Sequence, residues 1–135
     1  MSYTLRNLQD VEDQAVAFGI GEIQEARFPA DDVGAESTGF AHQVIHPRKR
    51  QGFAHRHAAA EEVYVVIGGA GRVKLDDEIV ELGRLDALRV APGVTRQFRG
   101  RAGRARDARL RAAPQGRRRD RPGILGGLGA RTRRG

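Results

Sequence analysis

The chain has 135 residues, enough for one domain with a buried core, and it contains no cysteine. The missing cysteines exclude disulfide bonds and thiolate metal sites. No apolar run reaches the roughly 18–20 residues that a membrane-spanning helix needs, and residues 1–14 lack the apolar core of a secretory signal. We therefore expect a soluble cytoplasmic protein without a membrane partner.

The net charge of +7 comes wholly from the C-terminal part of the chain. Residues 1–98 hold 11 Lys and Arg against 15 Asp and Glu, a net charge of −4. Residues 99–135 hold 13 Arg against 2 Asp, a net charge of +11. This division predicts a mildly acidic globular domain over 1–98, which is not a nucleic-acid binder, followed by an Arg/Gly/Ala-rich tail over 99–135.

The hydrophobic pattern of the first part is that of strands. Residues 7–21 are compatible with a helical turn, and no long segment with helical periodicity follows. Turn signals then recur every 8–12 residues, a spacing typical of an all-β sandwich or barrel. The expected strands cover residues 21–28, 38–46, 61–68, 71–75, 78–82, 85–90 and 94–98.

A short polar turn separates two of these segments, 71–75 and 78–82, which predicts a hairpin. The Gly-rich stretch 68–71 precedes this hairpin and does not fit a phosphate-binding loop, because such loops lead into a helix N-terminus. We expect its glycines to allow the positive φ angles of a tight turn.

Two of the four histidines, His55 and His57, lie one residue apart and shortly before Glu62. Residues two apart in a strand share a face, and a strand that begins at Glu62 can return a carboxylate beside the two rings. Two imidazoles and one carboxylate form a facial ligand set for a divalent metal, with positions left open for water or substrate. The alternative is a pair of exposed histidines that bind no metal.

The same stretch resembles the first motif of the cupin family, HxHxxxxE followed after six residues by Gly. The matching residues are His55, His57, Glu62 and Gly69. The motif's leading Gly falls at Lys49, so this element of the motif is absent. The resemblance implies a jelly-roll barrel of two antiparallel sheets that holds a metal or ligand in its mouth.

The resemblance covers about residues 35–98. Of the two adjacent glutamates, Glu62 has the motif's spacing, and Glu61 is expected to face solvent. His42 and His46 share strand parity, so either is a possible replacement ligand, although exposed or hydrogen-bonded histidines are the simpler interpretation.

The second cupin motif, G-x5-P-x-G-x2-H-x3-N, is degraded, and only Gly93 matches it. Leu85, Ala91 and Gly100 stand where Gly, Pro and Asn are expected, and Arg96 replaces the histidine that would be the fourth metal ligand. A guanidinium stays protonated and cannot coordinate a metal, but it binds carboxylates and phosphates well. Two alternatives remain: a three-ligand metal site beside Arg96, or a metal-free pocket in which Arg96 binds an anion.

We expect a divalent ion, Mn, Fe, Ni or Zn, at His55, His57 and Glu62. Arg96 is predicted to point inward, to pair with a carboxylate such as Glu62, and to bind substrate together with Tyr64. A barrel-packing role is the alternative for Tyr64.

Residues 99–135 contain no aromatic residue, no Val and no Lys. Such a polar, charged segment buries too little apolar surface to fold, so disorder is expected. Its composition is also typical of GC-rich DNA read out of frame. A one-nucleotide shift after Phe98 permits a sequence beginning Glu-Ala-Gly-Pro-Asp-Gly, which looks like the last hairpin of a cupin barrel. We therefore expect the last strands to be missing here.

Cupin function is not determined by the fold, since the family includes dioxygenases, isomerases, decarboxylases and non-catalytic binders. We expect a metal-dependent enzyme that acts on a small anionic metabolite, and a non-catalytic ligand-binding or sensor protein is the alternative. Nucleic-acid binding through the basic tail is a less favoured third hypothesis. The resemblance also implies a homodimer.

Overall fold

The computed structural model describes residues 2–102, 110–112 and 115–116. Two short helices lie near the N-terminus, the 3-10 helix η1 (Leu8–Asp10) and the α-helix α1 (Gln14–Ala17). Asn7 caps η1, and the Asp13 carboxylate accepts a hydrogen bond from the backbone N–H of Ala15 in α1. The expected helical turn within residues 7–21 is therefore confirmed.

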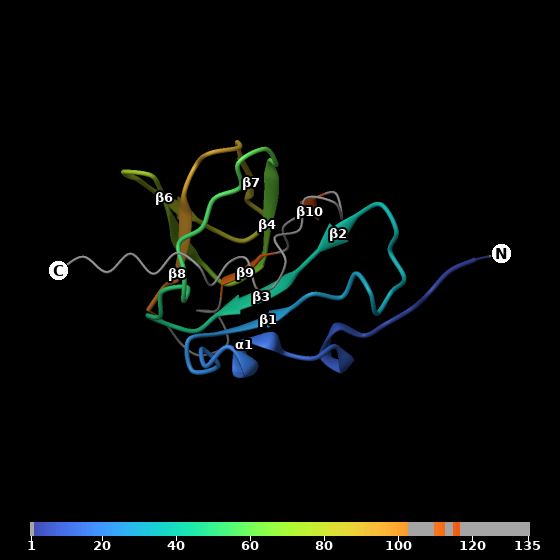
Figure 1. Ribbon diagram of the computed structural model, residues 1–135. Helices are drawn as coiled ribbons and strands as arrows, with labels where there is room; N and C mark the ends of the chain where they lie inside the picture. The colour runs from blue at the N-terminus through green and yellow to red at the C-terminus, as the bar shows by residue number, and fades with distance from the viewer. Residues whose placement is uncertain (1, 103–109, 113–114, 117–135) are drawn as a thin grey trace.

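The strands of the described residues are arranged in two antiparallel sheets (Figure 1). In the larger sheet the hydrogen-bonded order is β1-β3-β9-β4-β10-β2, and β7 pairs with β4; the smaller sheet has the order β6-β5-β8. The strands of the larger sheet are β1 (Gln24–Arg27), β2 (Gly39–Phe40), β3 (His42–Ile45), β4 (Glu62–Gly68), β7 (Ala87–Val90), β9 (Leu110–Ala112) and β10 (Gln115–Gly116). Those of the smaller sheet are β5 (Gly71–Leu75), β6 (Glu78–Leu82) and β8 (Arg96–Gly100). The all-β prediction is confirmed.

The predicted hairpin between β5 and β6 is confirmed, and its register runs from Gly71 opposite Leu82 to Leu75 opposite Glu78. Asp76, in the turn, has a φ of 48°, a conformation that Asp tolerates better than most residues. The turn between β4 and β5 includes Gly69 with a φ of 74°, as expected for a strand-to-strand turn. Strand β5 follows it, in place of the helix into which a phosphate-binding loop leads.

The hydrophobic core lies between the two sheets and is built from the inward-facing residues of both. In β4, Tyr64 and Val66 are buried, and in β8, Arg96 and Phe98 are buried. The core cluster consists of Ile45, Tyr64, Val66, Val73, Leu82, Val90 and Phe98. The rings of Tyr64 and Phe98 lie 4.7 Å apart between their centroids, so β4 and β8 contact each other across the interior.

The chain after Phe98 differs from the prediction. Phe98 lies inside β8, and the backbone of β9 occupies a position between β3 and β4 while that of β10 lies between β4 and β2. The expectation that the last strands are missing and that the tail does not pack is therefore wrong for these described segments. Sheet pairing uses backbone N–H and C=O groups, so a segment without an apolar pattern can still pair with open strand edges. The first tail residues, 99 and 100, belong to β8, and residues 103–109, 113–114 and 117–135 of the expected tail lie outside the described residues.

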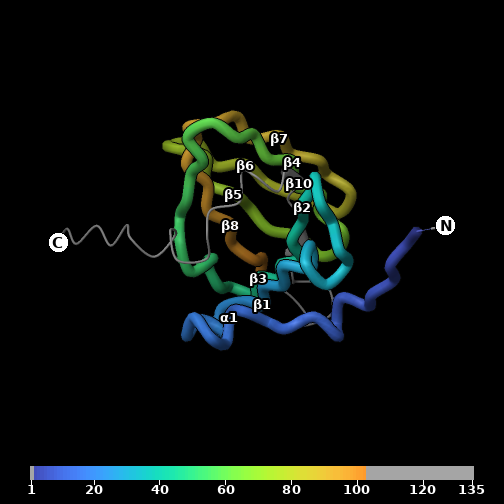
Figure 2. Tube along the Cα trace, turned by 45° about the vertical axis from the view of Figure 1, so that its right-hand side comes forward, coloured from blue at the N-terminus to red at the C-terminus, as the bar shows by residue number. Residues whose placement is uncertain are grey.

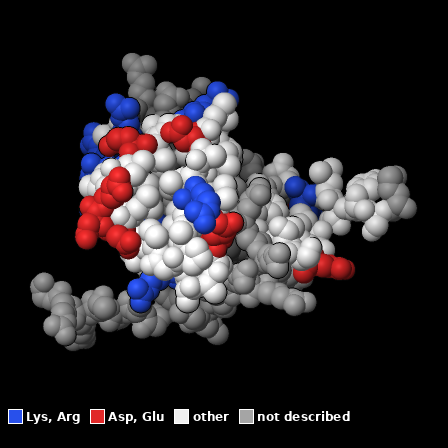
Figure 3. Space-filling view, turned by 90° about the horizontal axis from the view of Figure 1, so that it is seen from above, with Lys and Arg blue, Asp and Glu red and all other residues white. Residues whose placement is uncertain are grey.

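The helix α1 lies against β1, on the side away from β5, β6 and β8 (Figure 2). Seen from above, the described surface carries acidic and basic side chains beside one another (Figure 3). Within the described part of the chain, no helix is long and apolar enough to cross a membrane.

Candidate metal centre

The two motif histidines lie on an irregular segment, residues 53–57, that runs alongside the start of β8. His55 and Arg96 exchange two backbone hydrogen bonds, of 3.1 and 2.9 Å, and form an isolated antiparallel bridge. Two residues after His55, the carbonyl of His57 accepts a hydrogen bond of 2.7 Å from the backbone N–H of Gly93. These bonds fix the backbone of His55 to β8 and that of His57 to the turn before β8, although neither histidine belongs to a named strand.

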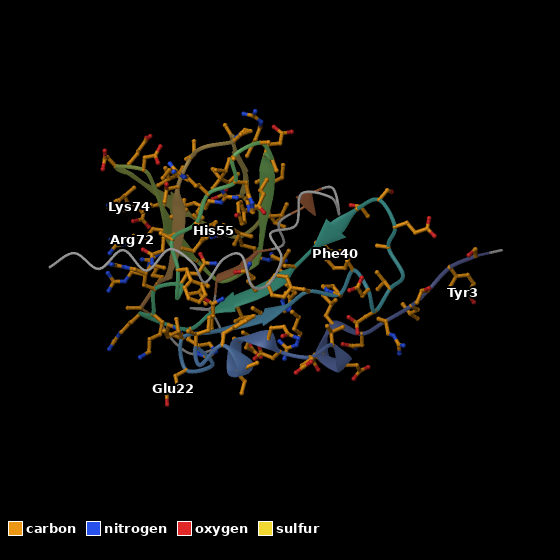
Figure 4. All side chains as sticks on the ribbon, in the orientation of Figure 1. Tyr3, Glu22, Phe40, His55, Arg72 and Lys74 are labelled. Atoms are coloured by element: carbon orange, nitrogen blue, oxygen red, sulfur yellow. The ribbon has the colours of Figure 1, made fainter. Side chains whose placement is uncertain are left out.

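The rings of His55 and His57 lie close together, as the alternation predicted. Their centroids are 5.5 Å apart, and the rings are nearly perpendicular, with an interplanar angle of 80°. Figure 4 places His55 in the part of the molecule that holds β4 and β8, remote from Phe40 and Glu22. The two imidazoles thus share one face of their segment.

Glu62 begins β4 and belongs to its inward-facing row with Tyr64 and Val66, so the row passes from the site into the core. Glu61 faces outward and forms an ion pair with Arg89, with 2.5 Å between the Arg89 Nε and a carboxylate oxygen. The choice of Glu62 over Glu61 as the third site residue is consistent with this arrangement.

The potential ligand atoms of His55, His57 and Glu62 all lie within 4.8 Å of one another. The Nε2 atom of His57 is 3.0 Å from one oxygen of Glu62, and the Nε2 atom of His55 is 3.8 Å from the other. Metal–ligand bonds of about 2.0–2.2 Å place two ligands at a right angle about 3 Å apart. The three side chains are 33%, 11% and 17% exposed, so the cluster reaches solvent. The donor set and its spacing fit a divalent ion.

Arg96 pairs with Glu62 as predicted, and its side chain is completely buried. Its Nη2 donates to the Oε2 atom of Glu62, its Nε donates to the hydroxyl of Tyr64 at 3.0 Å, and its Nη1 donates to the carbonyl of Val94 at 3.1 Å. The Tyr64 hydroxyl in turn donates to Glu62 Oε2. A substrate that contacted either side chain directly would have to displace Glu62, so their predicted role in substrate binding remains a prediction.

Sequence reasoning did not anticipate the contacts of Tyr64 and Val94. One signal was available for Tyr64, which lies two residues after Glu62 and therefore on the same face of β4. The carbonyl of Val94 offered no signal, because a backbone acceptor is not visible in the residue types.

The surroundings of Glu62 and His57 favour the protonation states that metal binding needs. Burial by itself raises the pKa of Glu62, but His55, Tyr64 and Arg96 outweigh it and hold this pKa well below its usual range. Burial lowers the pKa of His57 despite the opposing effect of Glu62, which favours the neutral imidazole. Burial and the Glu62 carboxylate raise the pKa of Tyr64, so its hydroxyl keeps its proton. Glu62 is therefore an anion and His57 a neutral donor near pH 7.

The possible replacement ligands are not part of this cluster. The Nδ1 atom of His46 lies 3.0 Å from the backbone carbonyl of Glu22, and His42 lies on β3. Across residues 2–102, no other His, Asp or Glu trio brings its ligand atoms this close. The cluster therefore offers three candidate ligands from the described chain.

The two-sheet architecture with this site at one end of β4 is that of the cupin jelly roll, and the predicted cupin-like fold is confirmed by solved structures. No protein-family model matches the sequence, and no curated protein is similar to it in sequence. The fold is thus recognised from structure, at sequence identities that support the fold alone.

Three of the similar structures illustrate the range of proteins that share this fold. A cupin protein from Bacteroides fragilis is 20% identical, with a TM-score of 0.65, over 87% of this chain and 85% of that chain. The polyketide cyclase RemF from Streptomyces resistomycificus is 18% identical, with a TM-score of 0.68, over 87% and 80%. A sugar phosphate isomerase of the cupin superfamily from Silicibacter pomeroyi is 19% identical, with a TM-score of 0.66, over 87% and 76%.

Proposed function

We propose that this chain binds a divalent metal ion through His55, His57 and Glu62 and acts on a small anionic molecule at that site. The observation that carries the proposal is the convergence of two imidazole nitrogens and one carboxylate within 4.8 Å, in a partly exposed position. Three protein ligands leave positions for a small molecule on an ion that accepts more than three. Mn, Fe, Ni and Zn all accept such a nitrogen and oxygen set.

Charge supports an anionic partner. The carboxylate of Glu62 and the guanidinium of Arg96 form a direct ion pair, so their charges cancel within the site. With neutral imidazoles, which metal binding requires, the charge of a bound divalent ion is not offset by the protein. A small anion would supply that offset. The chemistry of a sugar phosphate, the substrate class named for the Silicibacter pomeroyi structure, is of this kind.

A bound divalent ion would supply Lewis-acid polarisation of a substrate oxygen. The residues of this chain would orient the ligand set: β8 holds the backbone of His55, and β4 presents Glu62. Tyr64 and Arg96 keep their protons, because both have raised pKa values, so neither accepts a proton at neutral pH.

That last observation favours a second candidate function on the same fold, a ligand-binding protein without turnover. The two candidates share the metal and the anion and differ only in whether the bound molecule is converted. Incubation of the metal-loaded protein with candidate sugar phosphates, followed by NMR of the small molecule, separates them: new resonances support the enzyme, and line broadening alone supports the binder.

The metal is tested first. Protein purified without chelators and soaked in turn with Mn, Fe, Ni and Zn should retain about one equivalent of one of them by elemental analysis. His57→Ala should lose it, whereas His46→Ala should retain it, because His46 lies outside the cluster. Wild-type protein that keeps less than about a tenth of an equivalent after every soak would refute the metal site.

The anion is tested on Co²⁺-loaded protein. Sodium azide, a small anion that binds open metal positions, should shift the visible absorption bands of the Co²⁺ protein in a saturable way. Bands that do not change with azide would show that no position is open to an anion.

A further inference from the structure

The two oxygens of Glu62 have different partners. Oε1 lies 3.0 Å from the Nε2 atom of His57, and the Nε2 atom of His55 lies 3.8 Å from Oε2. Oε2 accepts hydrogen bonds from the hydroxyl of Tyr64 and from Nη2 of Arg96. Oε2 is therefore held by Tyr64 and Arg96, and Oε1 is the oxygen that lies next to His57.

Arg96, which donates to Oε2, is itself held in place by further hydrogen bonds. The side chain of Arg96 is completely buried, and its remaining nitrogens donate to the Tyr64 hydroxyl at 3.0 Å and to the Val94 carbonyl at 3.1 Å. Its backbone is bonded in both directions to His55. The same residue thus fixes the backbone of one ligand and the carboxylate of another.

Two effects of Arg96 on metal affinity oppose each other. A positive charge near the site repels a divalent ion. Hydrogen bonds to a ligating carboxylate orient it, and loss of such outer contacts typically costs about 10–100-fold in metal affinity. Because Arg96 is bonded directly to the anionic Glu62, the carboxylate offsets most of its field at the metal position, and the orienting effect dominates.

We propose that Arg96 and Tyr64 form a carboxylate clamp that presents Oε1 of Glu62 to the metal, so that three protein ligands suffice although an arginine occupies the position of a fourth. In this role Arg96 is a positioning residue and not a substrate contact. The proposal rests on the metal site proposed above. It accounts for an arginine that is fully buried at the edge of a polar site.

The test compares Zn²⁺ affinity across variants, by competition with a chromophoric chelator. Arg96→Lys keeps the positive charge but cannot donate to Glu62, Tyr64 and Val94 together. Arg96→Met removes the charge and the clamp, and Tyr64→Phe removes one hydrogen bond and no charge. The clamp predicts a Kd about 10–100-fold higher for both Arg96 variants and a smaller increase, up to about 10-fold, for Tyr64→Phe.

Arg89→Met is the matched control, because it removes an arginine from the neighbouring Glu61, outside the site. Its Zn²⁺ affinity should equal that of the wild type. The visible spectrum of the Co²⁺ form gives a second readout, and the bands of Arg96→Lys and Tyr64→Phe should shift as the carboxylate reorients.

The outcomes separate the two proposals. If the wild type binds no Zn²⁺, the proposed function fails. If the wild type binds Zn²⁺ and Arg96→Met binds it more tightly, or Arg96→Lys binds it equally, then Arg96 acts only through its charge and the clamp is refuted. If Arg96→Met does not fold, as the circular dichroism of the metal-free protein would show, Tyr64→Phe decides: unchanged Zn²⁺ affinity and unchanged Co²⁺ bands refute the clamp.

Discussion

Glu61 and Glu62 are neighbours in the chain, each bonded to an arginine, yet the two ion pairs lie in opposite environments. The side chains of Arg89 and Glu61 are 63% and 55% exposed, whereas those of Arg96 and Glu62 are 0% and 17% exposed. The outer pair joins the residue before β4 to the adjacent strand β7, and the inner pair connects the two sheets. The same two residue types thus serve as a solvated surface contact on one face of β4 and as part of a buried polar network on the other.

The difference shows why burial, and not residue type, determines what an ion pair does. Exposed pairs are screened by water and salt and contribute about 0–1 kcal/mol. A buried pair gains little net stability over an apolar pair, but removal of one partner leaves a desolvated charge. The inner pair is also bonded to Tyr64, so its geometry is determined by three side chains, which suits a functional site.

Both ion pairs depend on the position of β4. The largest expected effect on stability therefore comes from removing the strands that pair with β4. Ending the chain after Ala102 deletes β9, which lies between β3 and β4, and β10, which lies between β4 and β2. Sheet edges in the middle of the larger sheet would then be unpaired. We expect loss of cooperative thermal unfolding and aggregation in light scattering. A truncated chain with the melting temperature of the full chain would contradict the observed strand pairing.

A related prediction concerns the reading frame after Phe98. A chain that continues from Phe98 with Glu-Ala-Gly-Pro-Asp-Gly, followed by the alternating apolar sequence of the shifted frame, should pair with the same strands and also bury apolar side chains. Its melting temperature should exceed that of the present chain, measured side by side. Equal melting temperatures would count against a frame change.

Among substitutions in the two ion pairs, Arg96→Met should lower the free energy of unfolding most. It leaves the carboxylate of Glu62 without its main partner, and removal of one member of a buried pair typically destabilises a protein by about 3–5 kcal/mol. Urea unfolding of the metal-free protein measures this change. A loss below about 1 kcal/mol, the range of exposed pairs, would mean that the inner pair is solvated like the outer one.

The low pKa of Glu62 predicts how the inner pair responds to acid. Folding lowers this pKa from its usual value of 4.5, so the unfolded chain takes up the proton first as the pH falls. The stability that ionised Glu62 contributes is fully present above about pH 4.5 and is lost as the pH falls toward the folded-state pKa. In the presence of a chelator, the difference in unfolding free energy between wild type and Glu62→Gln should shrink from pH 7 to pH 3.5. A difference that grows over this interval would reverse the assigned direction of the shift.

Arg89→Met should have the smallest effect, within about 1 kcal/mol of the wild type, and less at high salt. The same urea experiment, repeated in dilute and in concentrated sodium chloride, provides the measurement. A loss as large as that of Arg96→Met would remove the distinction between the two pairs.

Much of the inner site could be predicted from the sequence because it depends on alternation and spacing. The parity of His55 and His57 placed both rings on one face, and the distance to Gly69 distinguished Glu62 from Glu61. The inward position of Arg96 followed from the degraded motif. The partners of its guanidinium did not, because they come from β4 and from the carbonyl of Val94, which only the packing of the two sheets brings together.

The strand pairing of the C-terminal part could not be predicted from the sequence. Its composition indicates how little apolar surface its side chains can bury, and from this we expected no packing. Strand pairing of Leu110–Ala112 and Gln115–Gly116 uses backbone groups, which every residue except proline supplies in full, so composition carries little information about it. The number of open strand edges in the rest of the fold, a long-range property, determines whether such a segment pairs.

The most direct test of the metal centre is anomalous diffraction from crystals of the Zn²⁺-soaked protein, recorded above and below the zinc edge. We predict a peak about 2.0–2.2 Å from the Nε2 atoms of His55 and His57 and from Oε1 of Glu62, with Arg96 and Tyr64 still bonded to Oε2. A difference map with no peak among these three residues would contradict the metal centre.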